Sequence, residues 1–119
     1  MTQIKTKRVY EIYSEEDGIR ILVDKLWPRG IKKEDLKYDI WEKDIVPSDS
    51  LRKRFHEDKI NNWDKFKSQY HQELLDSESV KTFIERIRQY PMVTLLYAAK
   101  DAERNHILIL KPFLEHKLR

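Results

Sequence analysis

The segment Met92-Val93-Thr94-Leu95-Leu96-Tyr97-Ala98 decides the fold class of this chain. It is a continuous run of mostly apolar residues that begins directly after Pro91 and ends where polar residues resume. A strand with one solvent-exposed face alternates apolar and polar residues, whereas an unbroken apolar run is typical of a strand buried on both faces. Such strands occur in parallel sheets that are covered by helices. The segment therefore predicts an α/β protein.

The other elements expected from the sequence fit that class. A second apolar strand is predicted at Ile19–Val23, and helical spacing predicts helices from about Ser48, from about Asn61 and over Ser79–Tyr90. A last helix is expected from about Ala102. The order strand, helices, strand, helix is that of an α/β domain. We therefore expect a single three-layer-like domain with a small, mostly parallel sheet flanked by helices.

Four local features give further expectations. Val9–Tyr13 has the composition of a short strand, and Tyr38–Ile45 that of an extended segment. Glu15-Glu16-Asp17-Gly18 is typical of a turn in which the glycine adopts a positive φ. Pro112 lies inside the last predicted helix and removes a backbone donor. We expect it to kink that helix or to divide it in two.

The composition indicates one folded domain over residues 1–119. Hydrophobic residues make up 39% and aromatic residues 11%, which is enough for a core, and 38% of the residues are charged. The absence of cysteine excludes disulfides, thiolate catalysis and cysteine-bound zinc. No signal-peptide core and no apolar run of membrane-spanning length are present. We therefore expect a cytoplasmic protein without a membrane partner.

The charge distribution bears on possible partners. The net charge is +3, and acidic residues are interspersed with basic ones along the chain. Nucleic-acid-binding proteins usually concentrate positive charge on one face or in a tail, so nucleic acid is not the favoured partner. The densest basic run, Leu51-Arg52-Lys53-Arg54, is more typical of a solvated helix surface. A nucleic-acid- or protein-binding module that uses this basic turn is the alternative function.

Polar and aromatic side chains follow both predicted strands at the points where the strands end. If the strands are parallel neighbours, the two loops open at the same edge of the sheet, where α/β proteins bind ligands. The loops would then bring together Asp24, Lys25, Trp27, Arg29, Lys100, Asp101, Asn105 and His106. Arg29 offers a bidentate fork for phosphate or carboxylate, and Trp27 offers a face for stacking. A structural interpretation also stands, in which Asp24 or Asp101 pairs with Arg29 and Trp27 covers the core.

A second candidate region is Phe55-His56-Glu57-Asp58, in which an imidazole lies beside two carboxylates. That combination suits acid–base chemistry, and a histidine stabilised at a helix C-terminus is the structural alternative. The remaining histidines lie far off in the sequence, so no metal site is predicted. The chain has neither a glycine-rich phosphate loop nor a nucleophile elbow, and we predict no cofactor.

The motifs described so far resemble those of a known family. In order, they are Val23-Asp24-Lys25-Leu26-Trp27-Pro28-Arg29-Gly30, Pro47-Ser48 with Leu51-Arg52, Phe55-His56-Glu57-Asp58, Trp63 with Phe66, and Thr94-Leu95-Leu96-Tyr97-Ala98-Ala99-Lys100-Asp101 through Asn105. Over nearly its whole length the chain is similar to the YeaO-like family of small bacterial proteins. Lys25 and Arg54 depart from the family pattern, which has arginine and tryptophan there. The resemblance implies a compact α/β fold, a cytoplasmic protein and no established activity or assigned catalytic residues.

The sequence thus predicts a domain that binds or processes an anionic small metabolite or a nucleotide-like ligand at the carboxyl ends of the strands. The expected ligand-binding residues are Trp27, Arg29, Arg52, Tyr97 and Asn105, and the expected catalytic residues are Asp24, His56 and Asp101. Carboxylates beside arginines stay ionised, so His56 is the better general acid. The sequence leaves open whether the protein is an enzyme, which oligomeric state it adopts, and whether it is a structural subunit of an assembly.

Overall fold

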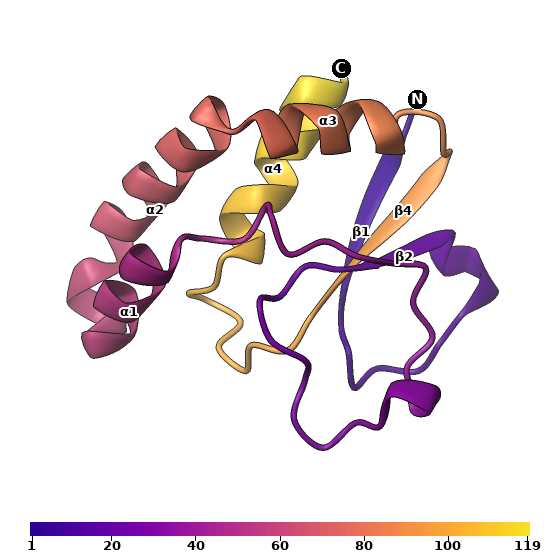
Figure 1. Ribbon diagram of the computed structural model, residues 1–119, viewed down its shortest axis with the longest axis horizontal. Helices are drawn as coiled ribbons and strands as arrows, with labels where there is room; N and C mark the ends of the chain where they lie inside the picture. The colour runs from indigo at the N-terminus through magenta and orange to yellow at the C-terminus, as the bar shows by residue number, and fades with distance from the viewer.

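Four parallel strands in the spatial order β1-β4-β2-β3 form the sheet of the protein. The computed structural model describes residues 1–119, and Figure 1 labels β1, β4 and β2 of this sheet. The strands are β1 (Gln3–Arg8), β2 (Ile19–Leu22), β3 (Ile40–Trp41) and β4 (Met92–Tyr97). The central β4 pairs with β1 on one side and with β2 on the other. The predicted α/β class and the parallel pairing of the two apolar strands are therefore confirmed.

Four helices complete the fold, and three of them begin at a short polar side chain. They are α1 (Asp49–Glu57), α2 (Lys59–Asp76), α3 (Glu78–Ile87) and α4 (Ile107–Leu118). Ser48, Asp58 and Ser77 each accept a hydrogen bond from the backbone amide three residues later, at 3.2–3.4 Å. The helix predicted from Ser48 is therefore confirmed. None of the four combines the length and apolar character that a membrane crossing needs.

The two faces of the sheet are covered by different kinds of chain. Val93 and Leu95 of β4 belong to the large core that includes the buried side chains of all four helices. Leu96 belongs to a smaller cluster on the opposite face, with the partly buried Trp27 and Trp41 packed against it. Irregular chain covers this second face, including the short 3-10 helices η1 (Glu15–Asp17) and η2 (Lys33–Asp35). The burial of Val93–Leu96 confirms that β4 is a strand buried on both faces.

The strand expectation for Val9–Tyr13 is wrong. The strand lies earlier, at Gln3–Arg8, and the chain then turns because the Glu11 amide donates to the Arg8 carbonyl at 3.0 Å. The Arg8 amide in turn donates to the Glu11 carboxylate at 2.5 Å. In the predicted extended segment Tyr38–Ile45, only Ile40–Trp41 pairs as a strand, with β2.

The last helix also differs from its expectation. α4 begins at Ile107 rather than near Ala102, because the Asp101 carboxylate first closes a separate turn by accepting from the amides of residues 103 and 104. Pro112 lies inside α4, and the helix continues through it as one element instead of dividing in two. The apolar face of α4 packs in the core on both sides of the proline, which stabilises the helix despite the missing donor.

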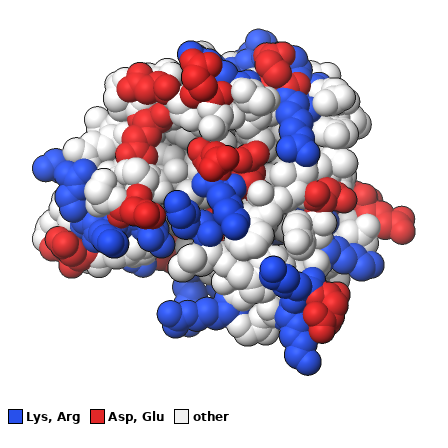
Figure 2. All heavy atoms as spheres, viewed as in Figure 1, with Lys and Arg blue, Asp and Glu red and all other residues white.

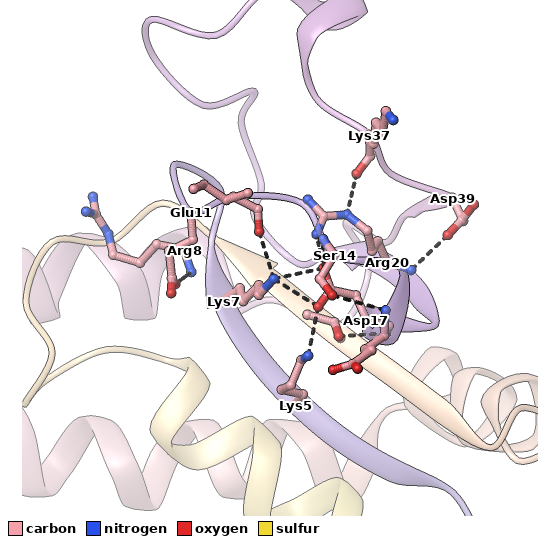
Figure 3. Close-up of polar contacts among 12 residues, drawn as sticks. Lys5, Lys7, Arg8, Glu11, Ser14, Asp17, Arg20, Lys37 and Asp39 are labelled. Carbon is pink, nitrogen blue, oxygen red and sulfur yellow. Dashed lines mark hydrogen bonds and ion pairs between the residues drawn. The ribbon is translucent and has the colours of Figure 1, made fainter.

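A buried carboxylate ties η1 to β1 and β2 on the loop-covered face (Figure 3). The Asp17 side chain is fully buried, and its Oδ1 lies 2.8 Å from Lys5 Nζ and 2.9 Å from Lys7 Nζ. Arg20 of β2 forms a third ion pair with it, and the Ser14 amide donates to the same carboxylate at 3.2 Å. Burial alone would raise the pKa of Asp17, but these donors together hold it well below its usual range. We call these four charged residues the Asp17 cluster.

Gly18, directly after this cluster, meets the backbone of β4. Its φ is +64°, as expected for a glycine at this turn, and a Cβ atom added there would lie 2.2 Å from the Met92 carbonyl oxygen. The absence of a side chain therefore allows the turn to lie against the strand. The Thr94 hydroxyl donates to the Asp17 carbonyl at 2.7 Å, which fixes the same contact from the β4 side.

Candidate functional site

A cavity of about 670 Å³ opens where β2 and β4 end. Residues 24–30 follow β2 and residues 98–106 follow β4, and both loops line it. α1 and the first half of α2 contribute another wall, with Phe55 and Phe66 stacked at a ring-centroid distance of 4.2 Å. Because the carboxyl ends of parallel strands share one edge of a sheet, this is the position predicted for a ligand.

The ionic lining of the cavity is almost entirely cationic. It consists of Lys25, Arg29, Arg52, Lys59, Lys100 and Arg104, with Asp24 as the one carboxylate. Three of the cations pair only with exposed acids outside the cavity, and the closest of those pairs is Arg52–Asp49 at 3.3 Å. Arg29, Lys59 and Lys100 form no ion pair. Charges that share a cavity and lack counter-ions in the protein attract anions from solvent.

Arg52 is the cation in this set with an incompletely satisfied guanidinium. Its Nη2 donates to Asp49 Oδ1 at 3.3 Å, while its Nε is buried and has no partner. A buried donor without an acceptor costs free energy, and an oxygen of a bound anion would satisfy it. Arg54, two residues on, is exposed and does not line the cavity.

Asp24 and His106 form a pair at the floor of the cavity. Their side chains are 15% and 14% exposed, and His106 Nε2 lies 3.4 Å from Asp24 Oδ1. The same Nε2 lies 2.7 Å from the Val23 carbonyl oxygen. Asp24 Oδ2 accepts from the Ala98 amide at 2.8 Å, which joins the ends of β2 and β4. The pair is therefore held by backbone groups of both strands.

Burial shifts both pKa values of this pair toward the neutral forms. It raises the pKa of Asp24, while His106 and the Ala98 amide offset part of that shift. It lowers the pKa of His106, while Asp24 and the Val23 carbonyl offset part of that shift. His106 is therefore uncharged at neutral pH.

His56 of α1 is a second imidazole in the lining. Partial burial lowers its pKa, together with the positive charges of Lys59 and Arg52 and the nearby His106. The exposed side chain also borders the outer surface beside Lys53. At neutral pH, His56 adds hydrogen-bonding nitrogens to the cavity rather than charge.

Trp27 has a packing role as well as a place in the cavity wall. Its Nε1–H donates to the Ile31 carbonyl at 2.6 Å, and its ring meets Tyr38 and Trp41 edge-on at centroid distances of 5.6 and 5.5 Å. The indole therefore fixes the loop after β2 against the second face of the sheet. Arg29 follows it, with an exposed side chain.

Two of the predicted site residues, Asp101 and Tyr97, lie outside the lining, and a third, Asn105, lies in it but is hydrogen-bonded to backbone groups. Asp101 does not line the cavity, and its hydrogen bonds from the amides of residues 103 and 104 lower its pKa. Asn105 is buried in the lining, where its Nδ2 donates to the Asp101 carbonyl at 2.7 Å and its Oδ1 accepts from the Leu108 amide at 3.2 Å. Tyr97 packs against the helix-side core and lies outside the lining.

The cavity thus brings together most of the predicted site residues: Asp24, Trp27, Arg29, Arg52, His56 and Asn105. Lys100 and His106 also lie in the lining, near the strand ends as the sequence predicts but with no predicted role, whereas no sequence pattern predicts Lys59 or Arg104 there. No local sequence pattern indicates that Lys59 lines the cavity, because its position depends on the break between α1 and α2 at Asp58. No group of three or more His, Asp or Glu side chains is placed to hold a metal ion.

Comparison with known proteins gives a family but no activity. Residues 3–119 match the model of a family described as the inactive DUF488-N3 subclade. The chain is 46% identical to the uncharacterized protein YeaO of Escherichia coli over 111 residues, which cover 93% of this chain and 96% of that protein. It is 36% identical to the uncharacterized protein Rv3073c of Mycobacterium tuberculosis over 113 residues, which cover 95% and 94% of the two chains. No solved structure matches significantly.

Proposed function

The chain belongs to the family described as the inactive DUF488-N3 subclade, and we propose that it binds an anionic small molecule in the cavity at the strand ends. The observation that carries the proposal is the lining, in which six cations face one carboxylate. That carboxylate, on Asp24, lies beside His106 and forms no ion pair with any of the six cations. Bound phosphate or carboxylate groups would relieve the repulsion among them.

The remaining wall defines the rest of the ligand. Apolar side chains such as Leu26, Val46 and Phe55 line the cavity beside the cations. A molecule with an anionic group at one end and an apolar or planar part at the other would contact both kinds of surface. A nucleotide-like molecule or a phosphorylated metabolite has this composition, and a cavity of about 670 Å³ is of a size that accommodates one.

The word "inactive" in the family description favours binding without turnover. The local geometry agrees with that choice, because Asp101 lies outside the cavity and Asp24 is engaged by backbone and by His106. His56 is the predicted proton carrier that stays free in the lining. A binding or sensing role is therefore the function we propose for the cavity.

The test is thermal unfolding with phosphate, ribose 5-phosphate, adenosine monophosphate and citrate at low salt, followed by calorimetric titration. A ligand at a hundred times its dissociation constant adds about 2.7 kcal/mol of stability, which is several degrees for a chain of this size. In Arg52→Gln we expect affinity to fall by roughly tenfold or more, because a charged hydrogen bond is lost. Arg54→Gln on the same helix is the matched control and should bind like the wild type.

Two results would count against the proposal. If none of the four anions shifts the unfolding temperature, the cavity is not an anion site. If short RNA binds in a salt-sensitive way and both Arg52→Gln and Arg54→Gln weaken it equally, the basic turn at residues 52–54 is the interface, as in the alternative function.

A further inference from the structure

The two ring nitrogens of His106 have different surroundings. Nε2 lies 2.7 Å from the Val23 carbonyl oxygen, which accepts hydrogen bonds and cannot donate them. The second group near Nε2 is Asp24 Oδ1, at 3.4 Å, which is another acceptor. Nε2 therefore carries the proton. In the neutral ring, Nδ1 is then a bare acceptor with a free lone pair.

Nδ1 has no hydrogen-bond partner within the protein, and it belongs to a side chain that lines the cavity. The side chain of His106 makes one hydrogen bond, through Nε2, and the residue lines the cavity. Two buried side-chain atoms lack a hydrogen bond: Arg52 Nε, and Asp17 Oδ1, which forms ion pairs with Lys5 and Lys7 instead. Nδ1 is also without a partner but is not among these buried atoms. A ligand in the cavity that reaches this nitrogen would find an acceptor with no partner in the protein.

Acceptors of this kind are scarce in the lining. The six lysine and arginine side chains are donors only. Asp24 Oδ2 and Asn105 Oδ1 already accept from backbone amides, and Asp24 Oδ1 lies 3.4 Å from His106 Nε2. His56 also lines the cavity, but its side chain is largely exposed to solvent. An anion that presents only acceptor oxygens would satisfy the cations and leave Nδ1 facing another lone pair. A ligand hydroxyl placed there would donate to Nδ1 and accept from a neighbouring cation.

We infer that the cavity selects hydroxylated anions, of the polyol phosphate class, by accepting a hydrogen bond from a ligand hydroxyl at His106 Nδ1. This inference rests on the proposed function, because it needs an anion in the cavity. It adds a specificity-determining residue that the ligand charge alone does not imply. Burial, which keeps the imidazole uncharged at neutral pH, leaves Nδ1 able to accept.

The test compares two ligands that differ only in hydroxyl groups, glycerol 3-phosphate and n-propyl phosphate, by calorimetric titration at pH 8. Both phosphates are then dianions, because their second pKa is about 6, so neither phosphate group can donate to Nδ1. We expect wild-type protein to bind glycerol 3-phosphate roughly tenfold more tightly, the effect of one hydrogen bond and one otherwise unsatisfied acceptor. His106→Phe should bind the two ligands equally, while His116→Phe, at the exposed end of α4, should keep the preference.

Long-range ¹H–¹⁵N spectra of the wild type give a second measurement that does not depend on whether His106→Phe folds. We expect His106 as the Nε2–H tautomer, with an Nδ1 resonance that moves on addition of glycerol 3-phosphate and not of propyl phosphate. Equal affinity for the two ligands in the wild type, or a protonated Nδ1, would overturn the inference and leave the proposed function standing. Failure of both ligands to bind would overturn the inference, and the proposed function would fall with it only if phosphate, ribose 5-phosphate, adenosine monophosphate and citrate also failed to bind.

Discussion

Lysine and arginine side chains gather at two places in this protein, and their surroundings differ. In the Asp17 cluster, Lys5, Lys7 and Arg20 converge on one fully buried carboxylate (Figure 3). In the cavity, six cations converge on a space whose single carboxylate is held by Ala98 and His106. We call the first group closed, because a buried carboxylate pairs with its cations and joins elements of the fold. We call the second group open, because no acid inside the cavity pairs with its cations. The comparison teaches that the placement of the acid, and not the number of bases, separates a structural cluster from a candidate binding site.

Removing the acid of the closed group is the largest change we predict. Asp17→Asn leaves three cations around a neutral buried amide, and breaking buried ion pairs in this way costs about 3–5 kcal/mol. Urea unfolding at pH 7 measures it. Asp49→Asn is the control, because the exposed Asp49 pairs with Lys25 and Arg52 at the surface, and its loss should change stability by less than about 1 kcal/mol.

The same cluster has a pH dependence with a definite sign. Because the pKa of Asp17 is lower in the folded protein than in the unfolded chain, its contribution is complete above the unfolded value of about 3.9. That contribution is lost as the pH falls below about 4 toward the folded pKa. Asp17→Asn should therefore lose much less stability than the wild type between pH 5 and pH 2. Parallel acid unfolding curves for the two proteins would contradict the role assigned to the cluster.

Gly18→Ala tests the close contact between β4 and the turn that follows Asp17. An alanine at a φ of +64° is strained by about 1–3 kcal/mol, and its Cβ would also overlap the Met92 carbonyl oxygen. We expect a destabilisation of at least that size in urea unfolding. Gly30→Ala is the matched control, because Gly30 also has a positive φ, +79°, but nothing lies within 4 Å of its added Cβ. Equal losses in the two variants would show that the contact with β4 contributes nothing.

The open group should respond to pH in a different range. The pKa values of His56 and His106 are lowered, so both rings gain a proton only as the pH falls below about 6.5. Protonation adds positive charge to the cavity, and protonation of Asp24 at lower pH removes a negative one. Affinity for propane-1-sulfonate, whose charge is constant over this range, should rise severalfold between pH 7.5 and pH 5. An affinity for propane-1-sulfonate that stays constant between pH 7.5 and pH 5 would show that His56 and His106 do not contribute to anion binding.

Trp27→Phe should have the smallest effect of these changes, and it distinguishes a role of the indole in packing from a role in ligand binding. The variant loses the hydrogen bond from Nε1 to the Ile31 carbonyl, which contributes about 1 kcal/mol to stability. Because the ring is held edge-on against Tyr38 and Trp41, we expect the affinity for anions to change by less than about threefold. A loss of affinity without a loss of stability would instead assign the indole to ligand stacking, as the sequence suggested.

The fold was predictable where a periodic pattern carried the information. The apolar run of β4 identified a buried parallel strand, and Ser48 marked the start of α1. Val9–Tyr13 misled because β-forming composition does not show where the chain turns, and the hydrogen bonds between Glu11 and Arg8 decide that. The start of α4 was missed because Asp101 caps a separate turn before the helix.

The candidate site was predictable to the extent that it follows strand ends. Asp24 and Arg29 come directly after β2, and the topology rule places them at the cavity. Lys59 is brought there by the path of two helices, which local sequence does not encode. The sequence also could not separate the two groups of cations. Acidic and basic side chains are interspersed on the face shown in Figure 2, and only three-dimensional placement shows which cations pair with Asp17.

The most direct test of the central contrast is a titration of ¹⁵N-labelled protein with glycerol 3-phosphate at low salt, followed by amide chemical shifts. The account predicts that shifts concentrate in residues 24–30, 52–59 and 98–106, around the open cavity, and that Lys5, Lys7 and Arg20 stay unchanged. Shifts centred on the Asp17 cluster, or spread evenly over the basic surface, would contradict it.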